Sequence, residues 1–254
     1  MKSCFFLLLL MTGVTFAAEE PLVLRIHGET TYTVEYPTWA GFGHDQAVIA
    51  DRHRGTGFLA RSDAGPFIIT AAHVVTGSWP VSTLTTAQGK TLTLGGTTIL
   101  RSAVFRIRIG DLALVPQEIA IDHDHDLAAL RLSPADLDLV NVRALLIDAQ
   151  APVMGKQLRA WGFPETAAPQ LSRPLEPSEA LGGLIVLNGS LAAGSSGGPV
   201  LLDDQVIGVV SRSDGQQTRV VDAAQIIRLI ASFERLRRTY ADNLLLSGGA
   251  TDNQ

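Results

Sequence analysis

The stretch Gly194-Ser195-Ser196-Gly197-Gly198-Pro199 decides the interpretation of this 254-residue sequence. Two glycines after a serine let the backbone fold tightly, so that neighbouring N–H groups can point into one small space. Converging N–H donors are what a developing oxyanion requires, and the loss of one donor slows acyl transfer by about a hundredfold or more. Ser196 would present its hydroxyl beside those donors as an attacking group. A plain serine–glycine turn between strands has the same composition, so the interpretation depends on the rest of the chain.

The candidate base lies in Thr70-Ala71-Ala72-His73-Val74-Val75. A serine hydroxyl is a poor nucleophile until a neighbouring imidazole accepts its proton. The small residues Ala71 and Ala72, at the end of an apolar run, would let the His73 side chain turn toward a cleft. A single histidine after a strand is more often a surface or core residue, so its weight comes from the other motifs.

The third group lies in residues 122–132, which read DHDHDLAALRL. A buried carboxylate fixes the tautomer of the catalytic histidine and stabilises the imidazolium that forms during attack. Asp126 directly precedes an apolar run, so its side chain can be held partly buried at the edge of a sheet. Asp111 begins a similar pattern, but Pro116 interrupts the strand that would follow. We therefore favour Asp126 over Asp111.

The body of the chain reads as all-β. Short runs rich in Val, Ile, Leu and Thr recur between Gly, Pro, Asn and Asp breaks, as expected of strands. The clearest runs are Gly57–Arg61, Phe67–Thr70, Thr91–Leu94, Ala103–Ile109, Gln157–Trp161, Leu184–Leu187, Val200–Leu202 and Val206–Ser211. Residues 62–66 (SDAGP) predict a turn between two of them.

One segment changes period near the end of the chain. From Asp222 the apolar residues repeat at the spacing of one helical face. They are Ile226, Leu229, Ile230, Phe233, Leu236 and Tyr240. Asp222 and Gln225 resemble a capping pair. The pattern predicts a C-terminal helix over 222–241 and a flexible tail over 242–254.

The first residues have the layout of a secretory signal peptide. Lys2 is followed by the apolar run Phe5–Val14 and then by small residues up to Ala18. The run has roughly half the length that a membrane-spanning helix needs, which disfavours an uncleaved anchor. We therefore predict a signal peptide over 1–17 and an exported protein, periplasmic or extracellular. No stable membrane insertion is expected after cleavage, since no later segment is apolar enough.

Composition excludes several functions. The only cysteine, Cys4, lies in the predicted signal peptide, so a cysteine nucleophile and a thiolate metal site are excluded. The formal charge of −5 and the absence of a concentrated basic surface argue against a nucleic-acid partner. The cluster Arg235, Arg237 and Arg238 lies near the end of the predicted helix, where it complements the helix dipole.

Taken in order, Ala71–His73, Asp126–Ala128 and Gly194–Pro199 resemble the chymotrypsin/trypsin superfamily of serine proteases. The order His, Asp, Ser separates this superfamily from other serine hydrolases. The resemblance covers roughly residues 45–232. It implies two six-stranded antiparallel β-barrels, the first over 18–135 with His73 and Asp126, the second over 136–221 with Ser196. The absence of disulfides and the sequences DLAALRL and WGFP, the latter at 161–164, look most like bacterial Deg/HtrA-type protease domains.

The same resemblance implies further roles. The backbone N–H groups of Gly194 and Ser196 would form the oxyanion hole. A polypeptide substrate would lie antiparallel to the strand that contains Ser211, Arg212 and Ser213, with Ser211 near Asp126. Ser190 would lie at the base of the primary specificity pocket. Because no carboxylate stands there, we expect a small or medium apolar side chain rather than Lys or Arg.

Two departures from the superfamily limit what is carried over. Ser195 stands where digestive proteases have an aspartate that pairs with a new N-terminus, so that mode of activation is not expected. No segment for a PDZ domain follows the predicted helix, so regulation of that kind is not expected either. The oligomeric state stays open.

The sequence leaves three other interpretations open. A metal could bind the alternating Asp and His residues of 122–126, although an extended strand would point the two types to opposite faces. A silent barrel could bind peptides without cutting them. An esterase would use the same acyl-enzyme chemistry. The favoured interpretation is a secreted trypsin-like serine endopeptidase that needs no cofactor.

Overall fold

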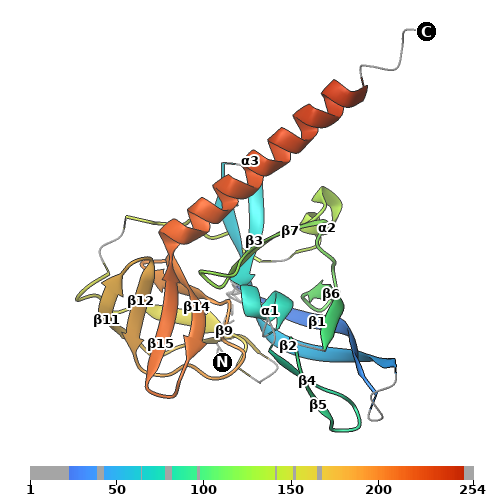
Figure 1. The fold of residues 1–254 in the computed structure, drawn as a ribbon. Helices are drawn as coiled ribbons and strands as arrows, with labels where there is room; N and C mark the ends of the chain where they lie inside the picture. Colours follow the sequence, from blue (N-terminus) through green and yellow to red (C-terminus); the bar gives the residue numbers. More distant parts are fainter. Residues whose placement is uncertain are drawn as a thin grey trace, which may run out of the picture.

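The computed structural model describes residues 23–38, 43–63, 65–77, 82–95, 98–140, 142–150, 153–164 and 168–248. The predicted signal peptide over 1–17 and residues 249–254 of the predicted tail lie outside this range. Two antiparallel sheets and a long C-terminal helix make up most of the described chain, in agreement with the all-β prediction (Figure 1).

The first sheet has six strands in the order β6-β1-β2-β3-β8-β7. Their bounds are β1 Leu24–Pro37, β2 His44–Ser62, β3 Gly65–Ala71, β6 Ile99–Ile109, β7 Glu118–Asp122 and β8 Leu127–Arg131. Strands β4 (Thr83–Thr85) and β5 (Thr91–Thr93) form a separate two-stranded ribbon. Among the described residues no ladder joins β6 to β7, so this sheet curls without closing into the predicted barrel. The predicted turn after β2 is confirmed, since β3 begins three residues after β2 ends.

Strands β1 and β2 extend well beyond the clearest strand runs of the sequence. Burial in β1 alternates strictly between Ile26 and Val34, the period of a strand with one buried face. The first half of β2 is mostly exposed, although Ile49 within it is buried with Tyr32 and Val34 of β1. Charged pairs add cross-strand contacts on β1, where Glu29 pairs with Arg52 of β2 at 2.9 Å and Glu35 pairs with Arg101 of β6 at 2.8 Å.

The second sheet has seven strands in the order β10-β9-β13-β14-β15-β12-β11. Their bounds are β9 Arg159–Gly162, β10 Gln170–Leu171, β11 Glu176–Leu181, β12 Leu184–Asn188, β13 Pro199–Leu202, β14 Gln205–Ser213 and β15 Gln217–Asp222. The prediction of six strands is wrong by one, because the two residues of β10 add a short pairing to the edge strand β9.

A shared hydrophobic core joins the two sheets and the C-terminal helix α3 (Ala223–Gly248). Its buried members include Phe58, Phe67, Ile69 and Leu127 from the first sheet, Leu201, Val206, Val209 and Val221 from the second, and Ile226 and Ile230 from α3. Burial of apolar surface here contributes roughly 25 cal/mol per Å². The packing of both sheets on one core fixes the line along which they meet.

The connection between the sheets is itself hydrogen-bonded to both. Leu145 N–H donates to the Leu59 carbonyl, and the Leu145 carbonyl accepts from Arg61 N–H, both at 2.8–2.9 Å. Val206 of the second sheet likewise exchanges hydrogen bonds with Leu146 and Asp148. The short helix α2 (Pro134–Asp138) precedes this segment. The division into domains at residue 135 stays a prediction.

Helix α3 follows the second sheet but returns to the first. Asp222 Oδ1 accepts a hydrogen bond of 3.1 Å from Gln225 N–H, which confirms the capping pair. Farther along, Glu234 forms an ion pair with Arg131 of β8, whose guanidinium lies 4.5 Å from the centre of the Phe67 ring. Figure 1 shows the helix running across the molecule and projecting past the sheets.

Helix α3 ends at Gly248, seven residues beyond the end predicted at residue 241. Asp242 and Asn243 cost a helix only fractions of a kcal/mol each, roughly 0.5 in most hosts, and helix-forming leucines follow them. No helix in the part of the chain described by the structure is both long and apolar enough to cross a membrane.

Candidate active site

His73 lies on the one-and-a-half-turn helix α1 (Ala72–Thr76), directly after β3. Ala71 and Ala72 are buried, and the chain turns from strand to helix between them. The other side chains of α1 point into the core, whereas that of His73 is 40% exposed and lines a cleft. Ala71 and Ala72 are thus small enough to be buried where the helix begins, and His73 faces the cleft.

Asp126 lies beside His73 at the end of the turn between β7 and β8. Its Oδ2 is 2.9 Å and its Oδ1 3.1 Å from His73 Nδ1, and Oδ1 also accepts the His73 backbone N–H at 2.9 Å. Asp126 has φ of 54°, a left-handed conformation that a residue other than glycine seldom adopts. Strained backbone of this kind is concentrated at functional sites.

The carboxylate of Asp126 is held in its charged form. Burial alone would raise the pKa of Asp126, but hydrogen bonds from the His73 ring and from the Ser211 hydroxyl outweigh it and leave the pKa below its usual value. The Ser211 hydroxyl donates to Oδ2 at 2.6 Å. With the carboxylate on Nδ1, the imidazole keeps its proton there and leaves Nε2 free to accept another.

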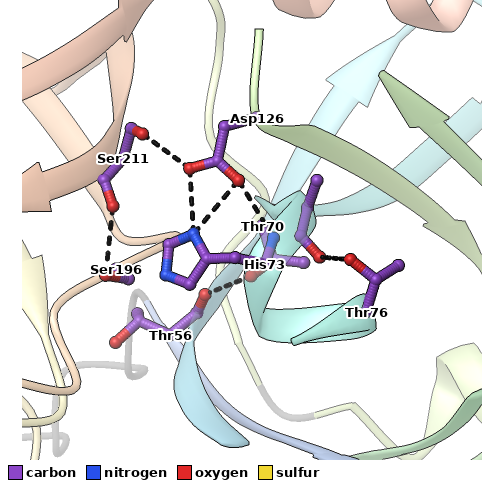
Figure 2. Close-up of polar contacts among 8 residues, drawn as sticks. Thr56, Thr70, His73, Thr76, Asp126, Ser196 and Ser211 are labelled. Carbon is purple, nitrogen blue, oxygen red and sulfur yellow. Dashed lines mark hydrogen bonds and ion pairs between the residues drawn. The ribbon is translucent and has the colours of Figure 1, made fainter. Parts of the chain in front are cut away.

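Ser196 comes from the second sheet, in the loop between β12 and β13. The Ser196 hydroxyl donates to the Ser211 carbonyl at 3.2 Å (Figure 2). In the part of the chain that the structure describes, this hydroxyl makes no hydrogen bond to the ring of His73. Both side chains line the same cleft. A rotation about the Cα–Cβ bond of Ser196 is therefore needed before its proton can pass to Nε2, and catalytic hydrogen bonds are often loose until substrate binds.

The loop before Ser196 leaves two backbone donors free. Ala192–Ser195 form a turn closed by the Ser195 N–H on the Ala192 carbonyl, with Gly194 in its third position at φ of 93°, as in a type II turn. The N–H groups of Ser195, Gly197 and Gly198 are all hydrogen-bonded. Among the described residues those of Gly194 and Ser196 have no partner, and both residues line the cleft.

Thr56 of β2 holds this loop from the first sheet, and sequence reasoning missed it. Its hydroxyl donates to the Gly194 carbonyl at 2.8 Å and accepts from Phe163 N–H at 2.9 Å. Its backbone N–H donates to the Ser196 carbonyl at 2.8 Å, and its own carbonyl accepts from the buried Thr70 hydroxyl. Thr56 is fully buried. A threonine between two glycines has no local pattern that distinguishes this role.

The cleft has a volume of about 800 Å³ and is bordered by one open strand edge. Strand β13 pairs with β14 only as far as Val209, and residues 211–213 continue beyond it. Arg212 and Ser213 pair on their other side with β15, and Ser211 lies at a shift in that register. Such an edge can accept an extended peptide as an added strand. Arg212 and Ser213 line the cleft together with Ser211.

Ser190 is exposed and is not among the residues that line the cleft. Its hydroxyl is 3.0 Å from the hydroxyl of Ser213, which also accepts from Leu191 N–H and lies 3.2 Å from Thr218 Oγ1. Ser213 therefore stands between Ser190 and the cleft.

Comparison with known proteins agrees with this geometry. The family of trypsin-like peptidase domains matches residues 55–209, more than half of the chain, a range that contains His73, Asp126 and Ser196. The chain belongs to this family. It is a serine endopeptidase of the trypsin-like type, a hydrolase. No curated protein matches the sequence of this peptidase.

Solved structures show the fold of the peptidase. Rv3671c from M. tuberculosis H37Rv, in an inactive form, is similar with a TM-score of 0.52 and 20% identity over 85% of this chain and 88% of that chain. The serine endoprotease from Yersinia pestis has the same TM-score at 17% identity over 85% of this chain. The peptidase spans 64% of the Yersinia chain, less than two thirds of its length. Both support the chymotrypsin-like architecture expected from the sequence.

The alternative carboxylate Asp111 lies elsewhere in the peptidase. It follows β6 and lines a separate pocket next to Leu112 and Leu139. The structure therefore brings Asp126, and not Asp111, to His73.

Residues 123–126 form a turn and not the extended strand that the metal alternative assumes. Asp122 organises this turn, because its Oδ1 accepts from the N–H groups of Asp124 and His125 and its Oδ2 lies 2.8 Å from His125 Nδ1. Over the described ranges no three such side chains come together as metal ligands.

Proposed function

We propose that the peptidase cuts polypeptides through a catalytic triad of His73, Asp126 and Ser196. The observation that carries this proposal is the bidentate contact of Asp126 with His73 in the same cleft as Ser196 and two unpaired N–H groups. After the Ser196 hydroxyl has rotated toward Nε2, His73 takes its proton as the oxygen attacks the scissile carbonyl. Asp126 keeps the ring oriented and stabilises its positive charge.

The oxyanion that forms would be bound by the N–H groups of Gly194 and Ser196. Their lack of other partners supports this role, because a donor that is already engaged would have to break a bond first. His73 then gives its proton to the leaving amine, and water repeats the sequence on the acyl-enzyme to release the acid product.

A fluorophosphonate probe tests the nucleophile. We expect mass spectrometry to find the probe on Ser196 of the wild-type protein and nowhere on the Ser196→Ala variant, while casein hydrolysis is lost in the variant. A folded wild-type protein that neither takes up the probe nor cleaves casein would overturn the proposal and favour the silent barrel.

We also propose that the protein is exported, periplasmic or extracellular, after removal of residues 1–17. The basic residue, short apolar run and small residues at the start of the sequence support export. N-terminal sequencing of the protein recovered outside the cytoplasm should begin at Ala18. Recovery of intact Met1 from the cytoplasm alone would contradict export.

A further inference from the structure

Two arginines stand directly opposite each other in the wall of the cleft. Arg212 of β14 pairs in register with Arg219 of β15, so their side chains lie on the same face of the sheet. Both are exposed, and both line the cleft that holds His73 and Ser196. Like charges at directly opposed positions destabilise a sheet.

Among the described residues neither arginine has an anionic partner. No carboxylate oxygen in those ranges lies within 4 Å of either guanidinium, whereas Arg52, Arg101 and Arg131 each have one. Asp214 is near enough for Arg219 to influence it, but its Oδ1 accepts the N–H groups of Gln216 and Gln217. Those backbone hydrogen bonds are the main reason that the pKa of Asp214 is lowered, and Arg219 adds to them.

The described carboxylates that line the cleft lie beside other groups. Asp126 is bonded to His73 and Ser211, and Asp51 lies 3.7 Å from the ring of His53. An acidic chain with a formal charge of −5 therefore keeps two unneutralised positive charges together at its candidate active site. A ligand that neutralises them must be anionic.

The direction of β14 decides which part of a substrate meets the arginines. Ser211 marks the scissile end, because its carbonyl lies 3.2 Å from Ser196 Oγ. A substrate antiparallel to β14 runs toward Ser211 from the side of Ser213, so residues opposite Arg212 precede the scissile bond. If the residue opposite Ser211 carries the scissile carbonyl, the one opposite Arg212 is the second before the bond. Side chains alternate in a strand, so the fourth residue shares its face.

We propose that Arg212 and Arg219 form an anion site that selects polypeptides with Asp or Glu at the second or fourth residue before the scissile bond. This inference rests on the proposed function of the same cleft. Two guanidinium groups offer planar forks of N–H donors that match a carboxylate, a stronger contact than hydrogen bonds between neutral groups.

Binding to an inactive variant tests the selection independently of catalysis. The probes are two fluorescent peptides that differ only in Glu or Gln at the second residue before the cleavage site, chosen from a sequence cut within casein or from a random peptide mixture. On Ser196→Ala we expect the Glu peptide to bind about tenfold more tightly, an effect that shrinks as salt is raised. The comparison is repeated with a second pair of peptides that differ in Glu or Gln at the fourth residue before the cleavage site. Equal affinities within both pairs would overturn the proposal.

Substitution of the arginines should remove the selection. Combining Ser196→Ala with Arg212→Gln and Arg219→Gln should bring the affinity ratio close to one, whereas Arg143→Gln, at an exposed arginine outside the cleft, should leave it at about ten. An unchanged ratio in the double arginine variant would place the anion site elsewhere and contradict the assignment. Fluorophosphonate labelling of the same variants with Ser196 restored reports on the nucleophile alone. Selective binding without labelling would refute the triad and keep the anion site. Labelling without selective binding would keep the nucleophile and refute the anion site.

Discussion

The hydroxyl of Thr56 donates a 2.8 Å hydrogen bond to the carbonyl of Gly194, a residue 138 positions later in the chain. This bond fixes the peptide group between Gly194 and Ser195, which lies between the two unpaired N–H groups of the loop. The first sheet therefore supplies His73 and Asp126 and also orients the backbone on which Ser196 is carried.

Removal of the Thr56 hydroxyl should misplace the loop. Thr56→Val leaves the Gly194 carbonyl and the Phe163 N–H without their partner, so we expect a loss of about 1–3 kcal/mol in the free energy of unfolding. We expect kcat/KM to fall at least about tenfold, mostly through kcat, since donors to the oxyanion shift. Thr56→Ser, which keeps the hydroxyl, should keep the unfolding free energy and kcat/KM near the wild-type values. Thr93→Val, at an exposed threonine, should change neither quantity. Full activity in Thr56→Val would refute this role.

Replacement of Asp126 by Asn should lower kcat by roughly ten-thousandfold, because an amide no longer holds the required tautomer or stabilises the imidazolium. Asp111→Asn is the matched control, since Asp111 lines a different pocket. Steady-state kinetics on one peptide substrate compares the two variants. A larger loss in Asp111→Asn would reverse the assignment.

Ser211→Ala should move the acid limb of the pH profile. Burial raises the pKa of Asp126, and the 2.6 Å hydrogen bond from Ser211 is one of the contacts that lower it. Without this bond the pKa of Asp126 should rise. Protonation of Asp126 would then begin at a higher pH and remove the charge that supports His73, so the acid limb of kcat/KM should shift toward higher pH. Ser178→Ala, at an exposed serine of β11, should leave the profile where it is in the wild type.

Two glycines with similar backbone angles should respond differently to alanine. Gly197 has φ of 84°, and a Cβ there would lie 2.1 Å from the Thr56 carbonyl oxygen. Gly155 has φ of 74° with nothing within 4 Å. Gly155→Ala should cost only the left-handed backbone penalty of about 1–2 kcal/mol, and Gly197→Ala should cost several kcal/mol, roughly 3–5, and abolish activity. Similar unfolding free energies for the two variants would show that the close approach is relieved.

His53 should make the fold sensitive to mild acid. Burial lowers the pKa of His53 below 6.5, and the nearby His73 lowers it further, against opposing effects of Val75 and Asp51. The unfolded chain therefore binds a proton before the folded chain does, so stability falls as pH drops below about 6.5. Denaturant titrations at pH 7.5 and 5.5 should show a smaller loss for His53→Gln than for the wild type. An equal loss of unfolding free energy in the variant and the wild type would exclude His53 as the source of the acid sensitivity.

The three residues of the proposed triad stand out in the sequence because each is marked by its own neighbours. Asp126 precedes an apolar strand, His73 follows small residues, and Ser196 precedes two glycines. The structure brings Asp126 to His73 and places all three in one cleft. Local patterns could indicate this grouping because the proposed chemistry constrains the residues next to each group.

Other features depend on partners far away in the sequence. The role of Thr56 rests on contacts with a loop 138 residues later, which no local pattern encodes. The first half of β2 is a strand because it pairs with β1 along its whole length, with Ile49 buried beside Tyr32 and Val34. The opposition of Arg212 and Arg219 follows from a one-residue shift in the register of β14 and β15 between Val210 and Arg212, without which Arg219 would stand opposite Ser211.

The return of helix α3 to the first sheet links the cleft to the order in which the chain is made. Glu234 meets Arg131, and Phe233 packs beside Phe67, across a hundred or more residues. A chain leaving the ribosome or an export channel exposes its first sheet long before these partners exist. The core shared by the two sheets is completed only when α3 emerges. The growing chain therefore contains His73 and Asp126 before Ser196 has been made, and the cleft can form only after the second sheet has been added.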